Sequence, residues 1–294
     1  MRIYTYFIIL LVSFGFISCE DVVDIDTQFE KPQMVVDAWV NDSPTSQIIK
    51  LTWSQNYFDS QIPEGIDGAT VKVIRNSQDT LSFSSMGKGI YQWNPSGNNS
   101  IGEIGDAFEL SIRYENAYIS SSTTLKRTAI IDSLVVEEKM DELGYDDGSY
   151  ASCYAVDIAG KGDAYWIKTF TNDTLNNKPR ELVISYDGTF DPGSSYDGLP
   201  FIRPLRDAVN RLSDDAGYIP YLPGDKVRVE IHSLSDEAYA YLSIIQEQLT
   251  NGDNTIFALP FANATGNVFN TTTHERVLGF FNVASITKEE ITIP

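Results

Sequence analysis

Short runs of β-branched and aromatic residues, separated by turn-forming residues, recur along most of this chain. The run at residues 69–74 alternates apolar and polar side chains, as a strand with one buried face does. Similar runs occupy residues 33–40, 48–53, 80–83, 90–93, 108–114 and 118–123. Short strands joined by turns over about 100 residues are typical of a sandwich. We therefore predict a mostly β protein with an N-terminal immunoglobulin-like β-sandwich over residues 32–126.

A second β-rich domain is predicted over residues 130–294. Its strand-like runs lie at residues 131–137, 150–158, 164–170, 181–186, 226–231 and 277–283. One amphipathic helix is expected near residues 235–250, because Ser235 can cap its start and Asn251-Gly252 ends it. Tyr239, Leu242 and Ile245 share one face of that helix, which we expect to pack on a sheet.

The N-terminal residues have the pattern of a secretory signal peptide. Arg2 is the only charged residue before Glu20, and residues 7–17 are almost wholly apolar. This stretch is too short to span a bilayer but suits a secretory signal. It ends at Ser18-Cys19, which resembles a bacterial lipobox with Phe16 in place of the usual leucine. We predict a signal peptide over residues 1–18 and lipidation of Cys19; the alternatives are an incidental cysteine after an ordinary signal, or a signal anchor.

An acidic tether is predicted over residues 19–31. It holds Glu20, Asp21, Asp24 and Asp26 close behind the cysteine. The arrangement resembles the signal that sends some lipoproteins to the outer face of the outer membrane, with Glu20 and Asp21 as the export signal. The alternative is a solvated spacer, because charged segments repel themselves and extend. We expect a protein anchored to the outer membrane through lipid and displayed at the cell surface.

Composition excludes several classes of function. The chain has 21 Lys and Arg against 41 Asp and Glu, a net charge of −20, so nucleic acid is not an expected partner. It has two His and two Cys, too few for a zinc site built from these residues alone. Once Cys19 is lipidated, Cys153 has no partner for an intramolecular disulfide, and we expect it to be a small buried hydrophobe.

Catalytic and metal-binding motifs are not evident. Neither His232 nor His274 lies in a recognisable catalytic motif, so we expect no catalytic residues and no cofactor. Acidic residues gather in two loops that could offer calcium its oxygen ligands. These residues are Asp141, Glu142, Asp146 and Asp147 in one loop, and Asp187, Asp191 and Asp197 in the other. Their spacing departs from the usual calcium-binding loop, so we expect solvated loops and no metal site.

Binding is the remaining class, and loop aromatics are its candidate residues. The proline-rich span from Asp187 to Pro223 contains Tyr196, Phe201, Tyr218 and Tyr221. Long loops without periodicity are often functional, so these four side chains are the predicted contact residues. The alternative is that the span wraps the second domain and buries its aromatics there.

Several local patterns together resemble one family, the Bacteroidota outer-membrane lipoproteins known as domain of unknown function 4249. The patterns are Asp24-Ile25-Asp26, Val35-Val36-Asp37-Ala38-Trp39-Val40, Leu51-Thr52-Trp53-Ser54, Tyr57-Phe58-Asp59, Gly68-Ala69-Thr70-Val71, Gly89-Ile90-Tyr91, residues 105–110, Ile131-Asp132-Ser133-Leu134 and Leu278-Gly279-Phe280-Phe281. The resemblance implies a lipid-anchored accessory protein that helps a TonB-dependent outer-membrane receptor to import nutrients, and it implies no catalytic residues. The alternative is a surface adhesin or scaffold that binds glycan or protein without transport.

Overall fold

The computed structural model describes residues 31–56, 59–97, 99–190, 197–215, 217–250 and 263–294. The chain divides into two compact units, and the larger comprises Pro32–Ser54 and Gln61–Pro294. In the described part of the smaller unit, the Asp59 amide donates to the Asn56 carbonyl at 2.9 Å and closes a turn.

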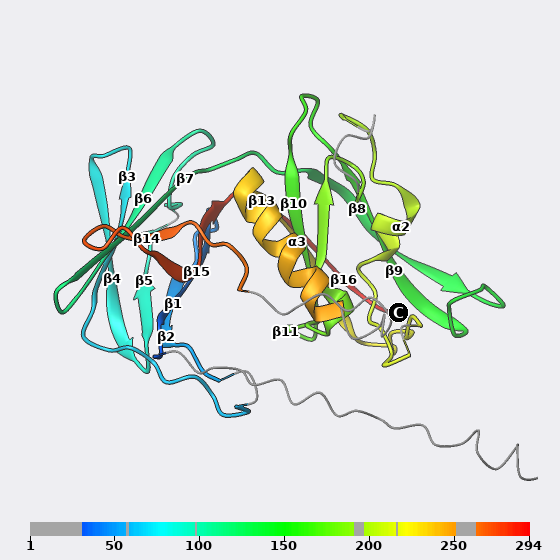
Figure 1. The fold of residues 1–294 in the computed structure, drawn as a ribbon. Coiled ribbons are helices and arrows are strands. Elements are labelled where there is room, and N and C mark those ends of the chain that lie inside the picture. The colour runs from blue at the N-terminus through cyan, green and yellow to red at the C-terminus, as the bar shows by residue number, and fades with distance from the viewer. Residues whose placement is uncertain (1–30, 57–58, 98, 191–196, 216, 251–262) are drawn as a thin grey trace, which may run out of the picture. The chain divides into compact units, whose positions relative to one another are not determined.

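Nine strands form a closed sheet (Figure 1). It encloses a hydrophobic core, called the first core, that contains Val36, Leu51 and Leu110. The order around the barrel is β1-β15-β14-β7-β6-β3-β4-β5-β2. Alternating side chains point inward, as the buried Val71 and Val73 of β3 do, because neighbouring residues of a strand face opposite sides. The strands are β1 (Met34–Asn41), β2 (Gln47–Trp53), β3 (Thr70–Arg75), β4 (Asp79–Gly87), β5 (Ile90–Trp93), β6 (Ala107–Tyr114), β7 (Ala117–Thr124), β14 (Val268–Asn270) and β15 (Arg276–Ala284).

The barrel differs from the expected immunoglobulin-like sandwich, and the difference lies in how its edges are closed. β15 pairs in parallel with β1, so that Val36 lies opposite Gly279, while β14 joins β15 to β7. β14 and β15 thus complete a sheet whose other seven strands lie between residues 34 and 124. Closure removes the exposed edges that two separate sheets would keep.

A second sheet follows, with strand order β11-β10-β13-β16 and with β12 paired to β10. The hairpin β8–β9 and the short helix α2 pack against it around a second core that contains Ile167, Val229 and Cys153. Cys153 is 2% exposed, which confirms it as a buried hydrophobe. The elements are β8 (Ile130–Lys139), β9 (Gly148–Val156), β10 (Ala164–Thr171), β11 (Thr174–Leu175), η2 (Pro179–Glu181), β12 (Val183–Tyr186), α2 (Arg203–Asp207), β13 (Lys226–Leu234) and β16 (Ile286–Thr292).

The expected amphipathic helix is α3 (Asp236–Thr250). Ser235 caps it, since its hydroxyl accepts a hydrogen bond from the Ala238 amide at 3.1 Å. Leu242 is buried beneath the helix in a third core, together with Phe280 from β15. The helix therefore covers the place where barrel and second sheet meet. None of the described helices combines the length and apolar composition needed to cross a membrane.

Candidate functional site

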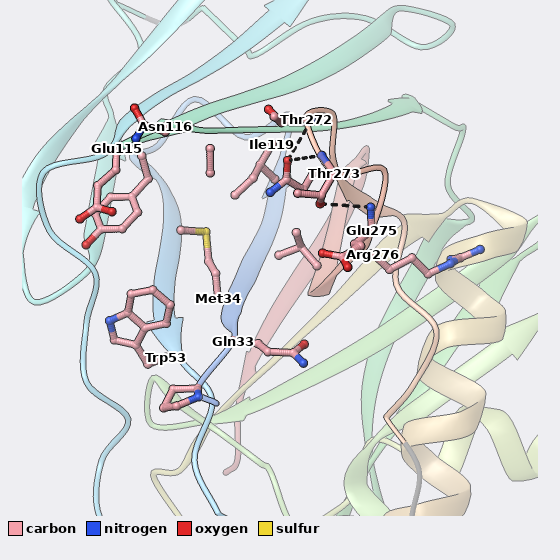
Figure 2. A pocket seen from close by; sticks show the side chains of 15 residues that line it. Gln33, Met34, Trp53, Glu115, Asn116, Ile119, Thr272, Thr273, Glu275 and Arg276 are labelled. Atoms are coloured by element: carbon pink, nitrogen blue, oxygen red, sulfur yellow. Dashed lines mark hydrogen bonds between the residues drawn. The ribbon is translucent and has the colours of Figure 1, made fainter. Parts of the chain in front are cut away.

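A pocket of about 760 Å³ opens at one end of the barrel, and we call it the barrel pocket (Figure 2). The start of β1, the end of β2, the β6–β7 turn and the β14–β15 turn surround it. The lining residues are Pro32, Gln33, Met34, Trp53, Tyr114, Glu115, Asn116, Ala117, Ile119, Asn270, Thr272, Thr273, Glu275, Arg276 and Val277.

One side of the barrel pocket is aromatic. Trp53 ends β2 and Tyr114 ends β6, and their rings meet edge to face with centroids 6.1 Å apart. Both side chains pack on the first core but remain partly exposed. In the view of Figure 2, Met34 lies between Trp53 and the β14–β15 turn. Apolar rings and a thioether here offer a surface for the apolar face of a ligand.

The facing side is polar and held in shape by the β14–β15 turn. The Asn270 side-chain carbonyl accepts hydrogen bonds from the amides of Thr272 at 2.9 Å and Thr273 at 3.3 Å. The Arg276 guanidinium donates to the Gly266 carbonyl at 2.6 Å, which fixes it at the rim. Hydroxyl, carboxylate and amide groups therefore face the aromatic side across the opening. Such a pocket suits a ligand with one apolar face and several hydroxyl or amide groups.

Sequence reasoning missed the barrel pocket, because Trp53 and Tyr114 look like ordinary strand aromatics. The available signal was their position as the last residues of their strands, where a side chain can leave the core. Nothing in the sequence indicates that Thr272, Thr273 and Glu275 line the pocket, because the pairing of β14 with β7 brings them there.

The predicted contact residues lie elsewhere. Tyr196 is outside the described residues. Phe201 and Tyr221 are each 3% exposed and belong to the second core, so they are not presented to a partner. Tyr218 stacks on Tyr145 with ring centroids 4.7 Å apart, and burial raises the pKa of its hydroxyl. Phe201 and Tyr221 thus behave as the alternative noted above expects, because both side chains enter the second core, whereas Phe190 of the same span is 43% exposed.

Buried charges help to hold that span in place. The Lys139 ammonium lies 3.5 Å from the Asp207 carboxylate and 3.7 Å from those of Glu137 and Glu142. The Tyr145 hydroxyl donates to Asp207 at 2.9 Å. Glu142, one of the acidic-loop residues considered for calcium, is thus engaged in ion pairs.

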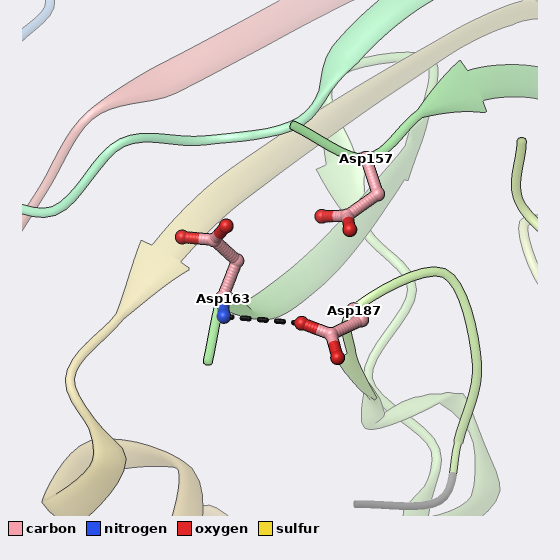
Figure 3. A group of neighbouring side chains, drawn as sticks. All are labelled: Asp157, Asp163 and Asp187. Carbon is pink, nitrogen blue, oxygen red and sulfur yellow. Dashed lines mark hydrogen bonds between the residues drawn. The ribbon is translucent and has the colours of Figure 1, made fainter. Parts of the chain in front are cut away.

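Three buried aspartates meet at one end of the second sheet (Figure 3). Asp157 follows β9, Asp163 precedes β10 and Asp187 follows β12. One carboxylate oxygen from each lies within 4.8 Å of the other two, a spacing that could hold a cation. Sequence reasoning grouped Asp187 with Asp191 and Asp197; Asp191 lies outside the described residues, and Asp197 accepts a hydrogen bond from the Gly160 amide at 2.7 Å.

Protein donors already occupy much of this cluster. Arg127 Nε donates to both Asp163 oxygens at 3.0 Å, and Tyr165 donates to Asp157 at 2.5 Å. The Asp163 amide donates to Asp187 at 3.2 Å. Burial raises the pKa of Asp157, and the Tyr165 hydrogen bond opposes that rise. The arrangement ties strand ends together, as buried carboxylates with satisfied hydrogen bonds do.

His232, one of the two histidines, lies within the second sheet. Its Nε2 atom is 3.0 Å from the Glu230 carboxylate, and the side chain is almost fully buried. Burial, with the nearby Lys168 charge, lowers the pKa of His232 to about 4. The ring is therefore neutral at pH 7.

Cys19, Glu20 and Asp21 lie outside the described residues, so their predicted roles in lipidation and export stay predictions. Comparison with curated proteins gives no match. Comparison with protein families gives a match over residues 20–290, which covers the barrel strands, α3 and nearly all of the second sheet. The chain therefore belongs to the family described as domain of unknown function (DUF4249).

Proposed function

We propose that this protein is a lipid-anchored outer-membrane accessory protein that assists a TonB-dependent transporter in capturing or importing a nutrient. Cys19 carries the lipid, and Glu20 and Asp21 direct the protein to the cell surface. In this proposal the protein acts as a binding scaffold and not as an enzyme, and the barrel pocket is the candidate place for cargo.

The short length of chain between the proposed anchor and the barrel pocket carries this proposal. Pro32, which lines the pocket, follows the 13-residue tether of residues 19–31 directly. A fully extended tether of that length spans at most about 45 Å. A lipidated Cys19 would therefore hold the pocket close to the membrane surface, within reach of a receptor in the same membrane.

Co-purification from membranes tests the partner. The full chain is extracted in mild detergent, and proteins that remain bound are identified by mass spectrometry. We expect an outer-membrane receptor in amounts comparable with the protein itself, because a stable accessory subunit should bury at least about 1,000 Å² on its partner. If no receptor co-purifies, the adhesin or scaffold function replaces transport.

Two tryptophan variants test whether the barrel pocket takes part. Trp53→Ala removes the aromatic side of the pocket, whereas Trp93→Ala removes a tryptophan that also packs on the barrel core but lies outside the pocket. We expect Trp53→Ala alone to reduce receptor-dependent uptake at equal surface abundance. Equal uptake by the two variants would exclude the pocket as the cargo site.

A further inference from the structure

A second, smaller cavity lies beneath α3, and we call it the helix pocket. It has a volume of about 280 Å³ and lies between α3, β10 and the segment that follows β11. Leu242 and Ile245 of α3 line it, with Trp166 of β10 and Trp39 of β1. The volume lies near the lower end of the range of ~300–1,000 Å³ for ligand pockets, so its occupant is small.

Trp39, Trp166 and Tyr241 line the helix pocket, and the buried Phe280 contacts the rings of Trp39 and Tyr241 from outside the lining. Trp39 meets Trp166 edge to face, with ring centroids 5.3 Å apart. Trp39 also stacks on Phe280 at 5.3 Å, and Tyr241 packs on the same Phe280 at 4.8 Å. The rings come from β1, β10, β15 and α3, so each is fixed by a different element. Such a rigid aromatic wall favours a planar or apolar ligand.

Lys168 brings a positive charge to this apolar wall. Lys168 and Trp166 lie on the same face of β10, and the ammonium sits 3.8 Å from the centroid of the indole ring. Among the described residues, no acceptor lies within hydrogen-bond or ion-pair distance of that ammonium. A half-buried ammonium that contacts a ring but hydrogen-bonds to no described acceptor has donors available to a ligand.

Two carboxylates, Glu230 and Asp37, act on Lys168 electrostatically without forming an ion pair with it, and each also faces another cation. Glu230, its cross-strand partner on β13, pairs with Arg228 and lies 3.0 Å from His232. Asp37 on β1 lies opposite Lys50 of β2.

The two charged residues that line the pocket near η2, Lys178 and Glu181, also have partners. Lys178 pairs with Asp214 at 2.9 Å, and Glu181 accepts a hydrogen bond from the Leu212 amide at 2.9 Å. Among the described residues that line the pocket, Lys168 is therefore the cation without an acceptor, and its burial lowers its pKa to about 8.

We propose that the helix pocket binds a small amphipathic anion, with an aromatic or short acyl body against the Trp39–Trp166 wall and a carboxylate or sulfonate group on Lys168. The anionic group supplies the acceptor that Lys168 lacks, and the rings enclose the apolar body. Bound anion favours the charged form of Lys168, so binding weakens as pH rises above about 8. This site is separate from the barrel pocket and does not depend on the function proposed above.

Isothermal titration with 2-naphthalenesulfonate tests the proposal on the full chain in lipid nanodiscs, with empty nanodiscs as the blank. The neutral 2-naphthalenemethanol reports on the apolar wall alone. Lys168→Met removes the charge and keeps most of the side-chain length, whereas Lys168→Arg keeps the charge. Lys72→Met, an exposed lysine on β3, is the matched control. Ile245→Trp fills the cavity from α3.

We expect saturable binding of the sulfonate at pH 7, weakened about tenfold or more by Lys168→Met and little changed by Lys168→Arg or Lys72→Met. Lys168→Met should leave binding of the neutral alcohol unchanged, while Ile245→Trp should abolish binding of both probes. The proposal is overturned if the parent protein shows no saturable binding of the sulfonate. It is also overturned if Lys168→Met binds the sulfonate as tightly as the parent, or if Ile245→Trp binds both probes normally.

Discussion

Gly279 is the residue on which closure of the barrel most directly depends. It lies in β15 opposite Val36 of β1, with a φ of +97° that side chains with a Cβ rarely adopt. A Cβ added there would lie 2.0 Å from the Val36 carbonyl oxygen, far inside contact distance. Gly279→Ala must therefore strain its own backbone and also push β15 away from β1.

These two costs can be separated with Gly105→Ala. Gly105 has nearly the same φ, +95°, but nothing lies within 4 Å of an added Cβ. The left-handed conformation alone costs about 1–2 kcal/mol, which is the loss of stability expected for Gly105→Ala. Gly279→Ala adds the loss of about two strand hydrogen bonds next to Val36, worth about 1 kcal/mol each. We expect a total loss of about 3–4 kcal/mol for Gly279→Ala.

Urea unfolding of the full chain, followed by tryptophan fluorescence, measures both variants. The Gly279→Ala midpoint should fall well below that of Gly105→Ala, with an unchanged dependence of the unfolding free energy on urea. Equal losses in the two variants would mean that the contact with Val36 is easily relieved. The β1–β15 pairing would then not be the tight closure described above.

Four further predictions follow from the anchor, the aspartate cluster and the helix pocket. Cys19→Ala should yield an unlipidated precursor, and palmitate incorporation at the parent level would contradict this. Replacing Glu20 and Asp21 by alanine should reduce surface labelling of intact cells at constant total protein, unless the acids serve only as a spacer. Arg127→Met should destabilise the fold by about 3 kcal/mol in urea unfolding, because it leaves a buried carboxylate without its cation. Burial lowers the pKa of Lys168 from 10.5 to about 8, so between those pH values the unfolded chain binds the extra proton. Stability of the parent relative to Lys168→Met should then rise with pH over that range, and a flat difference would contradict the burial of the charge.

Local physics made several elements predictable from the sequence. The alternation at residues 69–74 gives β3, because a period of two places every second side chain on the buried face. Ser235, Asp236 and the apolar stripe containing Leu242 give α3, because capping and helical spacing are properties of neighbouring residues. The burial of Cys153 followed from the lack of a disulfide partner.

Pairings between distant residues needed the tertiary structure. The apolar run that forms β15 is recognisable as a strand, but its periodicity does not say that β1, some 240 residues earlier, is its partner. That pairing turned an expected sandwich into a closed barrel.

The candidate sites depended on the tertiary structure for the same reason. Trp53 and Tyr114 form one side of the barrel pocket because β2 and β6 end at the same rim. The sequence suggested that Phe201 is an exposed loop aromatic, yet its side chain is buried because it packs into the second core. The hydrophobic pattern of the sequence determines which side chains are buried, whereas tertiary packing determines which residues they contact.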